Sequence, residues 1–135
     1  MSEDGARTAT IERYFAAIVA GDSAALDEVL SPDAVTRWPQ SGERIVGAGS
    51  CINVYENYPG GSPAIHQQRM TGEGDTWVVE STVDYGDDRW HVVSLITFDG
   101  PRIAGITDYF GPTLPAPEWR RQWVEIQDTG SGSGA

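Results

Sequence analysis

The second half of the chain changes its hydrophobic period to two residues, and this pattern constrains the fold more than any other feature. Four segments, 65–71, 76–85, 89–98 and 102–110, are rich in Val, Ile, Thr and aromatic residues. Short runs of Gly, Asp and Pro separate them, and such runs are typical of turns. The four segments therefore predict an antiparallel meander of strands.

The first third of the chain has helical spacing instead. Apolar residues three or four positions apart predict a helix from Thr10 that ends at Gly21. A second helix is expected directly after it, capped by Asp22 or Ser23. The two helices should form a hairpin.

A short strand over 34–38 and a third helix over 50–58 complete this half of the chain. Ser31-Pro32 is expected to stop the second helix before the strand begins. Helices first and strands later predict an α+β domain, in which a curved antiparallel sheet packs on three N-terminal helices.

The length of 135 residues fits one domain with a single core and a small cavity. We expect a flexible N-terminus over residues 1–7 and a folded domain over 8–126. The Gly- and Ser-rich segment 127–135 is expected to be a disordered tail or an artificial addition.

The charge balance bears on partners. Nine Arg and Lys against twenty Asp and Glu give a net charge of −11, which repels phosphate backbones and anionic membrane surfaces. Nucleic acid and membranes are therefore not expected as partners. A single cysteine, Cys51, and the lack of a targeting or membrane-spanning segment point to the cytoplasm.

No motif supports a metal or a nucleotide cofactor. His66 and His91 lie in different segments without the carboxylate or cysteine spacing of a metal site, and no phosphate-binding glycine loop occurs. Cys51 lies on the expected core side of the third helix and is interpreted as a small buried hydrophobe. We therefore expect no cofactor and no metal ligands.

Asp108 is the strongest candidate for a chemical role. It interrupts the apolar strand 103–110, and burial of a carboxylate raises its pKa towards the range of a general acid or base. Asp84 lies on another predicted strand and could approach Asp108 if both faced the concave side of the sheet. Two such carboxylates could divide acid and base roles. A solvated side chain at the Gly-Asp-Asp turn is the alternative for Asp84.

Tyr14 is the third candidate, because a phenol on the inner face of the first helix can aim its hydroxyl at a ligand. A core tyrosine bonded to backbone is the alternative. Several apolar side chains could wall a pocket for a flat or cyclic ligand, although each could be plain core: Trp38, Tyr55, Tyr58, Trp90, Val92 and Phe110.

Three stretches in this order, 12–22, 30–35 and 102–110, resemble the SnoaL-like branch of the nuclear-transport-factor-two-like superfamily. The resemblance covers about residues 8–125. It implies a cone of curved antiparallel sheet wrapped on helices, with a deep apolar pocket, and a homodimer formed through the sheet. Because one fold hosts many functions, the subfamilies are compared position by position.

The resemblance to SnoaL-like polyketide cyclases makes Asp108 the general acid/base of an intramolecular aldol closure. In limonene-epoxide hydrolases, Asp108 and Asp84 would match two carboxylates of an Asp-Arg-Asp triad, but the arginine falls at Thr82. In ketosteroid isomerases Tyr14 matches the tyrosine that donates to the dienolate oxygen. The base of those isomerases falls at Trp38, and their second acid falls at about Ser94.

These comparisons lead to a cofactor-independent enzyme as the first hypothesis. Asp108 would act on a cyclic, mostly apolar or aromatic molecule, by aldol closure or isomerisation, with Tyr14 donating to a carbonyl or hydroxyl. An epoxide hydrolase and a non-catalytic protein that binds hydrophobic small molecules are the alternatives. A domain that serves only dimerisation is a third alternative.

Overall fold

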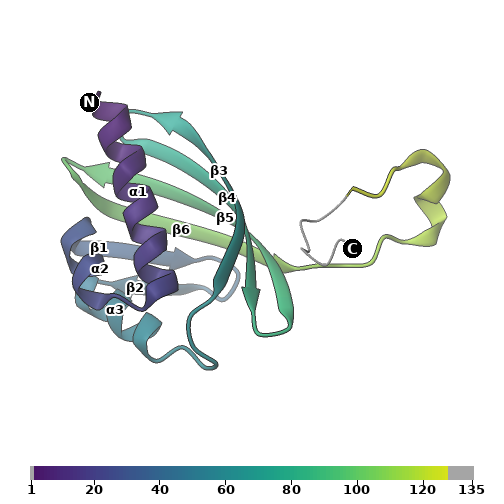
Figure 1. Cartoon of the computed structure of the whole chain (residues 1–135), viewed down its shortest axis with the longest axis horizontal. Coiled ribbons are helices and arrows are strands. Elements are labelled where there is room, and N and C mark those ends of the chain that lie inside the picture. The colour runs from purple at the N-terminus through teal and green to yellow at the C-terminus, as the bar shows by residue number, and fades with distance from the viewer. Residues whose placement is uncertain (1, 128–135) are drawn as a thin grey trace.

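A computed structural model gives the structure of residues 2–127. Three helices, α1 (Glu3–Ala20), α2 (Ser23–Val29) and α3 (Ala48–Glu56), lie against one face of a strongly curved sheet (Figure 1). The sheet has six strands in the order β2-β1-β6-β5-β4-β3. Their bounds are β1 Leu30–Trp38, β2 Glu43–Val46, β3 Ala64–Glu73, β4 Thr76–Tyr85, β5 Asp88–Asp99 and β6 Arg102–Pro112. The predicted α+β architecture is confirmed.

The first helix begins earlier than predicted. The Ser2 side chain accepts a hydrogen bond from the Gly5 N–H and caps α1, so the helix starts at Glu3 rather than near Thr10. Arg7 is buried and forms ion pairs with Glu3 and Asp75. Residues 3–7, within the segment 1–7 for which a flexible N-terminus is expected, form the first turns of α1 and are held by these contacts.

The helix hairpin forms as the sequence predicts. Gly21 ends α1 with φ 67°, in the left-handed region that glycine adopts without strain. The Asp22 carboxylate then accepts a hydrogen bond from the Ala25 N–H and starts α2. The two helices are thus joined by a sharp turn at Gly21 and Asp22.

Strands β3 to β6 form the predicted antiparallel meander. Two pairings were not predicted. Strand β1 pairs in parallel with β6, and the short strand β2 pairs with β1 in a region for which no strand was predicted. As a result, β6 is a central strand with β1 on one side and β5 on the other.

The core lies between the helices and the inner face of the sheet. Ile11, Tyr14 and Ala17 of α1 pack in one apolar cluster with Val79 of β4 and Ile96 of β5. Within the described part of the chain, no helix is long and apolar enough to cross a membrane.

Cys51 is 1% exposed, and its sulfur lies 3.4 Å from the Thr36 hydroxyl. This burial agrees with the interpretation of Cys51 as a small hydrophobe.

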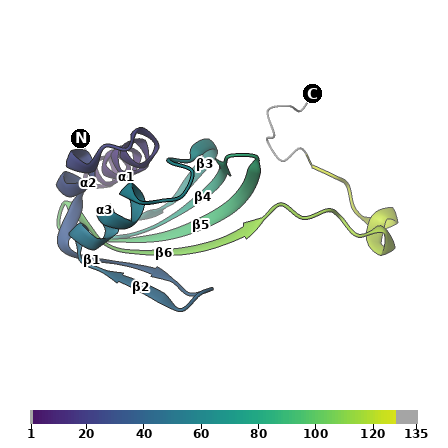
Figure 2. The same ribbon diagram turned by 90° about the horizontal axis from the view of Figure 1, so that it is seen from below.

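The chain leaves the body after Pro112. Residues 113–127, called the arm below, extend past the end of the sheet and contain a 3-10 helix, η1 (Glu118–Trp123) (Figure 2). Residues 113–126 of the arm belong to the segment 8–126 predicted as folded domain, and residue 127 to the predicted tail. Figures 1 and 2 both show the arm away from the helices. Residues 128–135 of the predicted tail lie outside the described residues.

Candidate active site

The site is built around Asp108 on the central strand β6. Ser94 of β5 is its direct cross-strand partner. On the other side, the pairing of Arg37 with Thr107 brings Trp38, the last residue of β1, next to Asp108. Side chains of neighbouring strands at paired positions lie on the same face, so all three side chains point to the inner face.

Both carboxylate oxygens of Asp108 accept a hydrogen bond from a side chain. The Ser94 hydroxyl donates to Oδ1 over 2.7 Å, and the Trp38 indole N–H donates to Oδ2 over 3.0 Å. The indole is a donor only, whereas the serine hydroxyl can also accept. A protonated Asp108 can therefore donate from Oδ1 to Ser94 while Oδ2 keeps the bond from Trp38. The arrangement suits both protonation states of the carboxyl group.

Burial raises the pKa of Asp108, and the hydrogen bonds from Ser94 and Trp38 offset part of this rise. Burial penalises the charged form, whereas donors to the carboxylate favour it. The net upward direction is the one that a group needs to exchange protons near neutral pH.

A pair of tyrosine hydroxyls lies within the electrostatic reach of this carboxylate. The hydroxyls of Tyr14 and Tyr55 lie 2.8 Å apart and share one hydrogen bond. Burial raises the pKa of both phenols, and the negative charge of Asp108 adds to the rise in both. Both tyrosines therefore stay protonated at neutral pH. Because one hydroxyl donates to the other, the pair retains one O–H hydrogen for a ligand.

Aromatic side chains adjoin this polar centre. The rings of Trp38 and Trp90 meet the Phe110 ring edge to face, with centroid distances of 6.3 Å and 6.1 Å. The Tyr58 and Tyr85 rings lie 4.8 Å apart. Burial, with smaller contributions from Tyr58 and Asp108, raises the pKa of Tyr85 to about 12. The Tyr85 hydroxyl is thus within the electrostatic reach of Asp108.

Val92 completes the predicted wall residues. It pairs with Phe110 across β5 and β6 and is partly buried. Of the predicted site residues, the structure brings Tyr14, Trp38, Tyr55, Trp90 and Phe110 together around Asp108, directly or through ring contacts. Tyr58 contacts this group through Tyr85.

Asp84 does not join the group. Its neighbour Val83 pairs with Trp90, which shares a face with Ser94, so Asp84 points to the opposite, outer face of the sheet. There it accepts two hydrogen bonds from Arg89, at 2.7 Å and 2.8 Å, and contacts His66 Nε2 at 2.6 Å. The Arg89 guanidinium, helped by His66, holds the pKa of Asp84 well below its usual range. The two carboxylates could approach each other only if both faced the concave side of the sheet, and the structure places them on opposite faces.

Sequence reasoning missed the polar roles of three residues. Ser94 holds Asp108, but only its place in the isomerase comparison drew attention to it. Trp38 and Tyr55 were assigned to an apolar wall, whereas both use their polar atoms. A signal was available for Ser94, because it is the one polar residue on the inward positions of β5 between Trp90 and Phe98.

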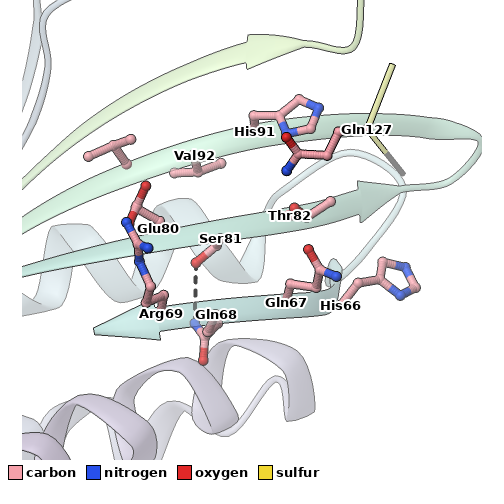
Figure 3. A pocket seen from close by; sticks show the side chains of 11 residues that line it. His66, Gln67, Gln68, Arg69, Glu80, Ser81, Thr82, His91, Val92 and Gln127 are labelled. Carbon is pink, nitrogen blue, oxygen red and sulfur yellow. Dashed lines mark hydrogen bonds and ion pairs between the residues drawn. The ribbon is translucent and has the colours of Figure 1, made fainter. Parts of the chain in front are cut away.

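A groove of about 940 Å³ crosses β3, β4 and β5, and Asp108 is not among its lining residues. Figure 3 shows side chains such as His66, Thr82 and His91 along it, with Gln127 of the arm near His91. Among residues 2–127, no group of three His, Cys, Asp or Glu side chains is placed to hold a metal ion.

Comparison with known proteins identifies the family. The SnoaL-like domain family matches residues 11–106, which is more than half of the chain. The chain belongs to the SnoaL-like domain family. This finding confirms the resemblance read from the sequence. No curated protein matches the chain.

Solved structures share the fold. An NTF2-like protein of unknown function from Burkholderia xenovorans LB400 is 31% identical, with a TM-score of 0.82 over 92% of this chain and 97% of that one. A proposed ketosteroid isomerase from Kribbella flavida is 22% identical, with a TM-score of 0.81 over 93% and 92%. An LEH-like epoxide hydrolase from Mycobacterium tuberculosis is 24% identical, with a TM-score of 0.65 over 79% and 84%. The last two, at this identity, establish the fold alone.

Proposed function

We propose that this SnoaL-like protein is an enzyme that acts on small cyclic, mostly apolar molecules, with Asp108 as its general acid/base. The observation that carries the proposal is that both carboxylate oxygens of Asp108 accept a hydrogen bond, one from Ser94 and one from Trp38. These bonds hold the carboxylate near the Tyr14–Tyr55 hydroxyl pair. Burial raises the pKa of this carboxyl, as a proton-transfer group requires.

The proposed reaction starts with proton abstraction next to a carbonyl. The ionised Asp108 takes a proton from the carbon beside the carbonyl, and the C–H electrons form the enolate. The developing oxyanion accepts a hydrogen bond from the free O–H of the Tyr14–Tyr55 pair. The step moves only a proton between Asp108 and the substrate, so it needs no metal or redox cofactor.

Two outcomes of the enolate fit this chemistry. Attack of the enolate carbon on a second carbonyl of the same molecule closes a ring, and Asp108 returns the proton to the new alkoxide. Return of the proton to a different carbon instead isomerises a double bond. We rank ring closure first because the resemblance to SnoaL-like polyketide cyclases places the acid/base at Asp108.

The epoxide hydrolase alternative is less well supported. In that comparison, Asp84 and Thr82 would stand beside Asp108, but both occupy outward positions of β4. Asp84 is also engaged by Arg89 and His66. The carboxylate partner needed to position a water molecule is therefore on the wrong face of the sheet.

We further propose that the protein forms a homodimer through the outer face of the sheet and acts in the cytoplasm. Support for the dimer comes from a cross-strand group of exposed apolar side chains on that face, called the sheet patch below: Val93, Leu95 and Tyr109. Exposed apolar patches of this kind mark interaction sites. The pocket expected beside Asp108, and its aromatic or apolar ligand, belong to the same proposal.

Solvent deuterium exchange tests the first step even when the product is unidentified. A panel of cyclic and aromatic ketones is incubated with the enzyme in D₂O, and exchange at the carbon beside the carbonyl is followed by NMR. We expect exchange that the wild type accelerates and Asp108→Asn does not. Equal exchange with both proteins would end the assignment of Asp108 as the acid/base.

The same panel separates catalysis from binding. A ligand that raises the melting temperature of the wild type, without exchange or product, favours a protein that only binds hydrophobic molecules.

A further inference from the structure

The arm exposes large apolar side chains that the body of the same molecule leaves uncovered. Leu114 is 76% exposed, Trp119 and Trp123 are each 72% exposed, and Ile126 is 73% exposed. Tryptophan is rarely this exposed on a monomer, and it is enriched where proteins bind one another. The arm thus has the composition of a docking segment.

The arm is also a shared part of the fold. Residues 1–112 account for 112 of the 135 residues, or about 83%. The matches to the Burkholderia and Kribbella structures cover 92% and 93% of this chain, so they extend about a dozen residues into the arm. Part of the arm therefore lies within the region that matches each of these two solved structures.

Within a pair of copies, charge favours the arm over the body as the part of one copy that approaches the acidic body of the other. Residues 1–112 carry seventeen Asp and Glu against seven Arg, a net charge of −10, whereas the arm has two acids balanced by Arg120 and Arg121. Two bodies of this charge repel each other. The arm is neutral and has two adjacent arginines. It can therefore approach an acidic body without the repulsion that a second acidic body would meet.

The matching apolar surface is present on the same chain. The sheet patch of Val93, Leu95 and Tyr109 is 37–46% exposed and adjoins the 940 Å³ groove, which Val93 also lines. In the single chain, the arm and the sheet patch are both exposed. Two copies related by a twofold axis can cover both, because each arm then lies on the other copy's sheet.

We propose that two copies of this chain exchange their arms, with Trp119 and Trp123 of each arm packed against the sheet patch and groove of the other copy. The proposal rests on the homodimer proposed above and adds the element that holds it. It is independent of the chemistry assigned to Asp108, whose readout is deuterium exchange.

The first experiment measures self-association of the full chain by sedimentation over a dilution series. We expect a wild-type dimer and at least about tenfold weaker association in Trp119→Ser/Trp123→Ser, because buried tryptophans dominate interfaces. Val19→Ser, which removes an apolar side chain 43% exposed on α1, serves as the matched control and should associate like wild type. Melting curves check that each variant is folded.

The second experiment locates the contact. Two single variants, Trp123→Cys and Val93→Cys, carry different tags and are mixed under mild oxidation. Cys51 stays in place because it is 1% exposed. We expect a disulfide between the two differently tagged chains, and none when Val19→Cys replaces Val93→Cys.

Each contrary result has a distinct meaning. A tryptophan double variant that associates as tightly as wild type removes the arm from the interface but leaves the sheet dimer standing. A wild type that is monomeric at every concentration overturns both the homodimer and the exchange of arms. A disulfide that forms only within one chain, in a Val93→Cys/Trp123→Cys variant, overturns the exchange in favour of an arm that folds back on its own sheet.

Discussion

Two aspartates on neighbouring regions of one sheet have opposite electrostatic environments. Asp108 faces inward from β6, where burial raises its pKa and two neutral side chains hold its oxygens. Asp84 faces outward from β4, where Arg89 lowers its pKa and holds it as a carboxylate. The residue type is the same, but the two side chains face opposite sides of the sheet and meet different partners.

The difference shows how a sheet assigns roles to its carboxylates. A carboxylate that is paired with a guanidinium has little tendency to take up a proton near neutral pH. A carboxylate among aromatic rings and neutral donors can both take up and release one. On this ground we propose Asp108 for the chemistry and a structural role for Asp84.

The largest expected effect comes from removing the inward carboxylate. Asp108→Asn keeps the hydrogen bonds, because its amide oxygen can accept from Trp38 and its NH₂ can donate to Ser94. It removes the proton-transfer group, so kcat/KM should fall by about 10²–10⁴-fold. Asp84→Asn is the matched control on the outer face, and we expect it to retain activity within about threefold. An equal loss in both variants, measured as exchange rates, would erase the distinction between the two faces.

The next largest effect concerns the hydroxyl pair. Tyr14→Phe and Tyr55→Phe each break the 2.8 Å contact, and we expect each to lower kcat by about 10²-fold, as loss of an oxyanion donor does. Because the two hydroxyls act as a unit, the double variant should be little worse than either single one. Fully multiplicative losses in steady-state kinetics would show that they act separately.

A smaller effect is expected from the donors to Asp108. Trp38→Phe removes the indole N–H that favours the charged carboxylate, so the pKa of Asp108 should rise further. The rising limb of the kcat/KM profile should then move to higher pH, with only a few-fold loss at the plateau. Ser94→Ala should move it in the same direction. Arg89→Gln, which acts on Asp84, should leave the profile in place, and a shifted profile there would count against the separation of the faces.

The smallest expected effects are changes in melting temperature with pH, which should have opposite signs for Asp84→Asn and Asp108→Asn. The pKa of Asp84 is lowered on folding, so its contribution is present above the unfolded value of about 3.9 and is lost as the pH falls through the folded pKa. Asp84→Asn should therefore melt below wild type at pH 7, with a gap that narrows in acid.

The pKa of Asp108 is raised on folding, so its ionisation destabilises the fold above about pH 3.9. Asp108→Asn should melt at or above wild type at pH 7, and this gap should also narrow in acid. Melting curves from pH 3 to 8 give the sign of the difference in melting temperature between each variant and wild type. A shift of the same sign in both variants would contradict the contrast.

Much of the fold follows from local sequence patterns. Alternation over 76–85 predicts β4 with the bounds that the structure has, and Gly21 ends α1 as expected. The pairings of β1 with β6 and of β2 with β1 could not be read locally, because they depend on contacts between separate segments of the chain. β2 has only four residues, too few for an alternating pattern to stand out.

The site was partly predictable. Asp108 was visible as a charge in an apolar strand, whereas its donor Trp38 depends on the unpredicted pairing of β1 with β6. The face of Asp84 could have been read, since Trp77, Val79 and Val83 occupy the alternate, inward positions of β4. The arm has no periodic hydrophobic pattern, so its position could not be predicted from the sequence.

Titration of the two carboxyl groups in one sample is the most direct test of their opposite environments. Carboxyl ¹³C shifts of the wild type, assigned with Asp108→Asn and Asp84→Asn, report both groups across the pH range. We predict a midpoint for Asp108 above the ordinary aspartate value of about 3.9 and a midpoint for Asp84 below it. A midpoint for Asp108 at or below the ordinary value would contradict its assignment as the general acid/base.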